Sequence, residues 1–258
     1  MIELADTRPD VGVAPDEYNR LLGYPRGGTP DGRAAELADQ ARAWYAAHGR
    51  PWVYARHAET LEIGSSSLSI DGVAFTASRL RVMLQRAGAH SVILVAVGAG
   101  PELEADASRL WRDGKPDEYF FLDVYGSTLV EHLITTTGAR LCTWAAQQGV
   151  TVLPHDSPGY PGWHVAEQPR LLDLLKHTRA HAWPCVVDAL ESGALRPTKS
   201  QLAVFGLTRH ADRLRGLAGA LPCEECSFEP CGYRKAPYRR RCQHPAADSL
   251  GSRDDVLT

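Results

Sequence analysis

Two hydrophobic patterns alternate along the chain and predict a mixture of helices and strands. In some stretches apolar residues recur every three to four positions, as on the buried side of a helix. Other stretches are short apolar runs rich in β-branched residues, which are typical of buried strands. The first pattern predicts helices over residues 33–48, 78–87, 103–113, 127–148 and 167–181. The second predicts strands over residues 52–55, 61–63, 67–73, 91–97, 150–153 and 201–207.

The segments outside these elements differ in character. Residues 1–33 are rich in Gly, Pro and Asp and predict an arm followed by a loop. Residues 118–125 are apolar and aromatic and lead into the long helix. Residues 245–258 are polar, so we expect a disordered tail there. Together the elements predict the α+β class, folded as one domain.

Composition places the chain among ordinary globular proteins. Its 258 residues are 44% hydrophobic and 23% charged, which is enough to build a core. The formal net charge of -3 argues against nucleic-acid binding over the whole surface. The N-terminal stretch has no basic and apolar regions of the kind found in signal peptides, and the apolar run at 92–100 is too short to span a bilayer. We therefore expect a cytoplasmic protein with neither a membrane nor a nucleic-acid partner.

A cluster of cysteines near the C-terminus suggests a metal site. The four residues are Cys223, Cys226, Cys231 and Cys242, with spacings of two, four and ten residues. Cytosolic thiols stay reduced, so this pattern predicts metal ligands rather than disulfides. Structural zinc sites usually pair two C-x2-C hooks and this chain has one, which favours a [4Fe–4S] cluster over zinc. Three ligands would leave one iron open, so Cys242 is an optional fourth. Unpaired cysteines in a tail and a zinc-ribbon RNA-binding segment are the alternatives.

A second candidate site follows the predicted strand at 150–153, where residues 155–164 read HDSPGYPGWH. A Pro-Gly-Tyr turn exposes backbone groups that no side chain covers. Tyr160 and Trp163 could stack on a planar or cationic ligand beside it. The alternative, which the sequence supports equally, is a turn that its aromatic residues merely stabilise.

Several motifs, taken in order along the chain, resemble those of one family. Residues 157–160 (SPGY), with Trp163 and the pair at 167–168, resemble the S-adenosylmethionine-binding motif of the activation domain of cobalamin-dependent methionine synthase. Its free-standing relatives are still more similar. Similar motifs stand at residues 21–24 (LLGY), 98–102 (GAGPE), 122–127 (LDVYGS) and 197–200 (PTKS). The free-standing relatives also share the cysteine cluster followed by Tyr-Arg, so the resemblance spans residues 15–235.

The resemblance implies a bent antiparallel sheet with flanking helices, and S-adenosylmethionine held at the Pro158-Gly159-Tyr160 loop. It divides the chain into an N-terminal arm (1–14), an activation-domain-like domain (15–215), a Cys-rich metal-binding segment (216–244) and a disordered tail (245–258). In the parent enzyme this domain supplies a methyl group that reactivates an oxidised cobalamin, with an electron from a flavin protein. Two positions depart from the family. His155 replaces an arginine that grips the ligand's carboxylate, and Gln201 lies near the position of a tyrosine.

We therefore expect a transferase that uses S-adenosylmethionine reductively with an iron–sulfur cluster. Tyr160 and His155 are the predicted catalytic residues, and Asp123 and Glu131 are predicted to hold the ligand's amine or ribose. The predicted ligand-binding residues are Pro158, Gly159, Tyr160, Trp163, Asp123 and Glu131. The acceptor would be a corrinoid on a partner protein or a small molecule, because the chain lacks the D-x-H-x-x-G corrinoid motif. Flavodoxin or ferredoxin would supply the electron. The alternatives are corrinoid-free transfer or cyclisation of the aminocarboxypropyl group, and a non-catalytic binding module stabilised by zinc.

Overall fold

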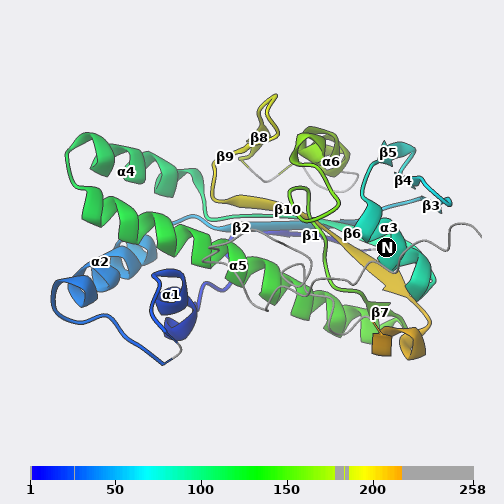
Figure 1. Cartoon of the computed structure of the whole chain (residues 1–258), viewed down its shortest axis with the longest axis horizontal. Coiled ribbons are helices and arrows are strands. Elements are labelled where there is room, and N and C mark those ends of the chain that lie inside the picture. Colours follow the sequence, from blue (N-terminus) through cyan, green and yellow to red (C-terminus); the bar gives the residue numbers. More distant parts are fainter. Residues whose placement is uncertain (1, 26, 178–182, 184–185, 217–258) are drawn as a thin grey trace, which may run out of the picture.

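The computed structural model describes residues 2–25, 27–177, 183 and 186–216, and within them five strands form a curled main sheet (Figure 1). Its strand order is β1 (Glu3–Asp6), β2 (Trp52–His57), β6 (Ala89–Gly98), β10 (Ser200–Thr208), β7 (Thr151–Val152). All neighbouring strands are antiparallel. β6 is central because its apolar run is buried on both faces, and β10 pairs with almost its whole length. The expected α+β class with a bent antiparallel sheet is confirmed.

One face of the sheet is covered mainly by a long helix. The helices on this side are α1 (Pro15–Leu21), α2 (Gly32–His48), α4 (Pro101–Arg112) and α5 (Pro116–Gln147). Ala203 and Phe205 of β10 point to this face. α5 is continuous, whereas the sequence predicted a helix only from residue 127. The aromatic stretch at 118–125 forms its first turns, and Pro116 suits the first helical position, where no N–H is needed. No helix in the described part of the chain is long and apolar enough to cross a membrane.

Smaller elements cover the opposite face, where Leu202 and Val204 of β10 enter the core. They are α3 (Ser78–Ala87), α6 (Gln168–Lys176), and a small sheet of β3 (Leu61–Ile63), β4 (Leu68–Ile70) and β5 (Val73–Phe75). A hairpin of β8 (Asp188–Ala189) and β9 (Leu195–Arg196) and the 3₁₀ turns η1 (Val165–Glu167) and η2 (Ala211–Gly216) complete the described elements. Side chains on the two faces of β10 therefore pack into two different hydrophobic cores.

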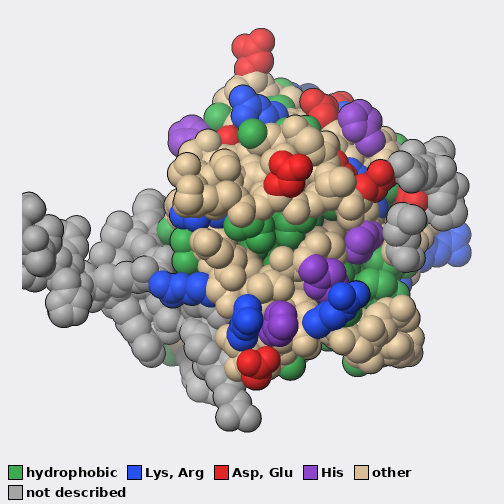
Figure 2. All heavy atoms as spheres, turned by 90° about the vertical axis from the view of Figure 1, so that its right-hand side faces the viewer, with side chains coloured by type: hydrophobic (Ala, Val, Ile, Leu, Met, Phe, Trp, Pro, Cys, Tyr) green, Lys and Arg blue, Asp and Glu red, His purple; other side chains and the backbone are tan. Residues whose placement is uncertain are grey.

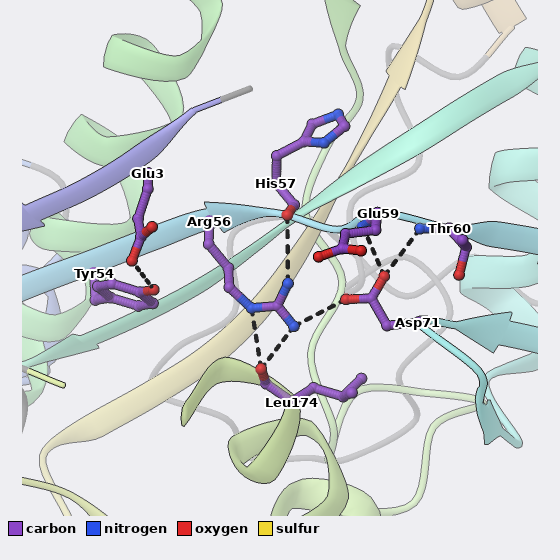
Figure 3. Close-up of polar contacts among 8 residues, drawn as sticks. All are labelled: Glu3, Tyr54, Arg56, His57, Glu59, Thr60, Asp71 and Leu174. Atoms are coloured by element: carbon purple, nitrogen blue, oxygen red, sulfur yellow. Dashed lines mark hydrogen bonds and ion pairs between the residues drawn. The ribbon is translucent and has the colours of Figure 1, made fainter. Parts of the chain in front are cut away.

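Arg56 joins β2 of the main sheet to α6 and to the loop that carries Asp71 (Figure 3). Its guanidinium donates to the carbonyl oxygen of Leu174, near the end of α6, at 3.0 Å from Nε and 2.6 Å from Nη2. Nη2 also lies 2.9 Å from Asp71 Oδ2, while Asp71 Oδ1 accepts from the backbone N–H groups of Glu59 and Thr60. Arg56 is buried, so these partners are needed to offset the desolvation of its charge.

Histidine and basic side chains gather at the end of the molecule that lies to the right in Figure 1, mainly in the lower half of the view in Figure 2. Near the start of β6, burial lowers the pKa of His90, and the charges of Arg209 and His210 lower it further. Burial also lowers the pKa of His57, whose Nε2 lies 2.8 Å from Ser91 Oγ. Both imidazoles are therefore held towards their neutral forms.

The structure differs from the sequence prediction mainly in short elements. Residues 1–33 were expected to form an arm and loop, but they contain β1, which pairs with β2, and α1, which has seven residues. A strand of four residues and a helix of two turns are too short to show a clear period. The expected helix at 167–181 is α6, which ends at Lys176 where His177 caps it. Residues 217–258, with the predicted Cys-rich segment and tail, lie outside the described residues.

Candidate functional site

The loop that carries the Pro-Gly-Tyr motif lies beside β10. β7 has only two residues, and beyond it the loop takes over the edge of the sheet: Asp156 and Val204 exchange two backbone hydrogen bonds of 3.0 and 2.8 Å. The chain then turns, with Tyr160 N–H donating to Ser157 O at 3.0 Å. Gly159 has φ +97°, which a type II turn requires at its third position. This turn places Tyr160 on the surface, half-buried.

A buried ion pair between the loop and α3 fixes the start of the loop. Asp156 is fully buried, and its Oδ1 lies 3.1 Å from Nη1 of Arg79, at the start of α3. The same oxygen accepts from Ser157 N–H at 3.0 Å. A buried carboxylate with these partners restricts where the following turn can lie.

Trp163 fixes the loop at its other end. Its indole N–H donates to Glu167 Oε2 at 2.9 Å, and its ring packs edge-on against Phe75 with centroids 5.8 Å apart. Glu167 also accepts from Thr76 N–H, so it links the loop to β5. Trp163 is 2% exposed, which places its ring in the core. Of the two aromatic residues predicted to stack on a ligand, Tyr160 is the one at the surface.

Polar groups from β10 and the loop meet at the Tyr160 hydroxyl. Gln201 Nε2 lies 3.2 Å from Tyr160 Oη and 3.1 Å from Ser157 Oγ, and donates to both. His155 Nε2 lies 3.3 Å from the same hydroxyl, and the His155 ring is tilted against Phe205 with centroids 5.3 Å apart. Gln201 lies near the position where the family resemblance implies a tyrosine. Its side-chain amide instead donates a hydrogen bond to Tyr160 of the loop. We call His155, Tyr160 and Gln201, together with Glu131 at the same level of α5, the candidate site.

The position of Glu131 follows from the register of α5 along β10. A Cβ at Gly126 would lie 3.0 Å from Lys199 Cγ, and one at Gly138 would lie 3.2 Å from Phe205 Cε1. The helix and the strand therefore run in the same direction. Glu131 lies five residues beyond Gly126, about 7.5 Å along the helix. At about 3.3 Å per strand residue, this brings the half-buried Glu131 level with Gln201.

Three of the motifs that carry the family resemblance meet at Lys199, just before β10. Ala99 N–H, from the 98–102 motif, donates to Lys199 O at 2.9 Å. From the 122–127 motif, Asp123 Oδ2 lies 2.8 Å and Ser127 Oγ 2.9 Å from Lys199 Nζ. Asp123 was predicted to bind the ligand's amine or ribose, and in the structure it forms an ion pair with Lys199. These three motif segments are thus neighbours in space.

The predicted metal ligands Cys223, Cys226, Cys231 and Cys242 lie outside the described residues. Within the part of the chain that the structure describes, no three His, Cys, Asp or Glu side chains are grouped closely enough to hold a metal ion. The iron–sulfur and zinc predictions therefore rest on the sequence pattern.

Comparison with known proteins bears on the fold. No protein-family profile matches the chain, and no curated protein sequence matches it either. Among solved structures, the "Crystal Structure of the MetH Reactivation Domain bound to AdoHcy" matches with a TM-score of 0.56 over 82% of this chain and 78% of that one, at 14% identity. The chain has the fold of the MetH reactivation domain. The resemblance read from the motifs is thereby confirmed as a resemblance of fold, and the candidate site lies on the face of that fold where α5 and β10 meet.

Two residues that position the loop and the start of β10 could not be recognised from the sequence. Arg79 stands 77 residues before Asp156, and nothing in its local sequence marks it as the loop's anchor. Lys199 was noted only as part of a motif, because it lies two residues before the predicted strand at 201–207 and the strand pattern therefore did not place its side chain.

Proposed function

We propose that this chain binds S-adenosylmethionine at the candidate site. The observation that carries the proposal is the loop tyrosine: Tyr160 is presented by the Pro-Gly turn and fixed through its hydroxyl by Gln201. The fold likeness to a structure that holds AdoHcy supports the same ligand class. A half-buried carboxylate level with Gln201 supplies the negative charge that a cationic ligand needs.

The roles we assign follow from the chemistry of each group. The Tyr160 ring attracts the positively charged sulfonium through its π face. Glu131 accepts hydrogen bonds from the ligand's amine or ribose. Gly159 is exposed and leaves its backbone carbonyl open to the ligand, whereas Pro158 is buried and shapes the turn. Trp163 acts by holding the turn, as its burial favours.

We further propose that the ligand is used reductively. A cluster on Cys223, Cys226 and Cys231, with Cys242 as the optional fourth ligand, would pass on an electron from flavodoxin or ferredoxin. The methyl group would go to the reduced cobalt of a corrinoid on a partner protein, which leaves S-adenosylhomocysteine. The fold likeness to a methionine synthase domain supports a corrinoid partner, and the cysteine spacing supports the cluster.

Calorimetric titration tests the binding proposal. Wild type should bind S-adenosylhomocysteine with one ligand per chain. Tyr160→Ala should weaken binding of S-adenosylmethionine, the ligand that carries the sulfonium, about 2- to 30-fold, because a cation–π contact contributes about 0.5–2 kcal/mol. Trp111→Ala is the matched control, since Trp111 is an exposed aromatic residue on α4 and should leave affinity unchanged. Absence of binding to wild type, or equal losses in both variants, would refute the proposal.

Metal and sulfide content tests the redox half. Protein purified without oxygen should contain about four irons with matching sulfide and absorb near 400 nm. Loss of this absorbance in Cys226→Ala would tie the cluster to the predicted ligands. One zinc and no colour would replace the transferase with a binding module stabilised by zinc.

A further inference from the structure

The geometry points to the Lys199–Asp123 ion pair as the receptor for the amino-acid end of the ligand. Lys199 takes the carboxylate, and Asp123 accepts a hydrogen bond from the ammonium. This inference rests on the proposed function and fixes which end of the candidate site the amino acid occupies. It differs from the orientation implied by the family resemblance, in which position 155 meets the carboxylate.

The ammonium of Lys199 is positioned by several contacts and keeps one donor for a ligand. Its side chain crosses α5 where Gly126 has no side chain. Nζ then lies 2.8 Å from Asp123 Oδ2 and 2.9 Å from Ser127 Oγ. An ammonium has three N–H donors, and within the described residues these two contacts use two of them. The third can bind a carboxylate without breaking the existing pair.

Asp123 keeps acceptor capacity and charge. Its side chain is 33% exposed, and among the described residues Oδ1 makes no hydrogen bond. Its negative charge is also the main cause that raises the pKa of Tyr119. A zwitterion brings a carboxylate and an ammonium together. An exposed edge of a Lys–Asp pair therefore satisfies both ends without burying net charge.

The distances suit the ligand. Lys199 lies in the bend just before β10 and its side chain contacts α5, and Gln201 lies on the strand face that also carries Ala203 and Phe205 towards α5. Two residues of chain span at most about 7 Å. Gln201 in turn holds Tyr160, over which the sulfonium is proposed to sit. Only three saturated carbons separate the sulfur from the carboxyl group, so one ligand can reach from Tyr160 to Lys199. The other end of the site carries the half-buried ring of His155, which rests on the buried Phe205 and suits the adenine base.

Two ligands that differ only at the amino-acid end test the assignment. S-Adenosylhomocysteine carries that end, and 5′-methylthioadenosine lacks it. Lys199→Met should weaken S-adenosylhomocysteine about 10-fold or more, because a charged hydrogen bond is lost, and leave the Kd of methylthioadenosine unchanged. Asp123→Asn should show the same selective loss, and Lys199→Arg should recover part of the affinity. Retained methylthioadenosine binding shows that each variant is folded.

Controls separate this inference from the proposed function and from the alternative orientation. Lys176→Met breaks a surface pair with Asp188 of similar length, 2.9 Å, and should change neither affinity. If His155→Gln selectively weakens S-adenosylhomocysteine while Lys199→Met does not, the carboxylate lies at position 155 and the inference is wrong. If wild type binds neither ligand, the proposed function itself fails.

Discussion

Removal of Arg79 should both destabilise the protein and loosen the ligand loop. Asp156 is fully buried, the Arg79 side chain is 11% exposed, and their charged atoms lie 3.1 Å apart. Removing one partner of a buried pair leaves an uncompensated charge and costs about 3–5 kcal/mol. Because Ser157 N–H still donates to Asp156, we expect the lower end, about 3 kcal/mol, for Arg79→Met. The turn at Tyr160 follows Asp156 directly, so S-adenosylhomocysteine affinity should fall in the same variant.

Urea unfolding followed by tryptophan fluorescence measures this cost. Asp156→Asn removes the negative charge of the same pair. The variant that carries both substitutions should lose about 1–3 kcal/mol less stability than the sum of the two single losses. Arg33→Met is the matched control, since its pair with Glu36 lies on the surface and its loss should be undetectable. A loss below about 1 kcal/mol in Arg79→Met, or strictly additive losses, would refute the anchoring role.

Three further predictions concern the scaffold. Burial lowers the pKa of His57 below its usual value of 6.5, so the unfolded chain binds a proton more readily than the folded chain. The free energy of unfolding should therefore fall as the pH drops below about 6.5. In unfolding curves measured between about pH 5 and 7.5, His57→Gln should reduce this dependence on pH. Gly206→Ala would place a methyl 2.6 Å from Leu153 Cδ1 and should cost about 1–3 kcal/mol; an unchanged urea midpoint would contradict this packing. Tyr45→Phe removes the buried hydroxyl that donates to Ala99 O at 2.7 Å. The free energy of unfolding, measured by thermal unfolding, should fall by about 1 kcal/mol. An unchanged stability would show that this hydrogen bond contributes nothing.

Much of the fold followed from hydrophobic period because the main elements are long and buried. The apolar runs at 91–97 and 201–207 became β6 and β10, and the helix predicted at 78–87 ends at Gly88 in the left-handed conformation that glycine favours. β1, β8 and β9 have between two and four residues, which gives no measurable alternation. They form because a neighbouring strand supplies hydrogen-bond partners. The residues of a short strand do not themselves indicate which segment will lie beside it.

The candidate site was only partly predictable for a related reason. The Pro158-Gly159 turn is a local signal, and it presents Tyr160 at the surface as expected. Whether Trp163 faces a ligand or the core depends on Phe75 and on Glu167, and an aromatic residue beside a turn fits either case. The contact between Gln201 and Tyr160 joins positions 41 residues apart, which no spacing rule anticipates.

Hydrogen–deuterium exchange with and without S-adenosylhomocysteine shows whether the ligand binds between the loop and α5. Binding there should slow exchange in peptides that cover residues 155–160 and in the α5 segment around Glu131. Peptides from α3 should change little. Protection confined to other parts of the chain, or none at saturating ligand, would rule out this binding site.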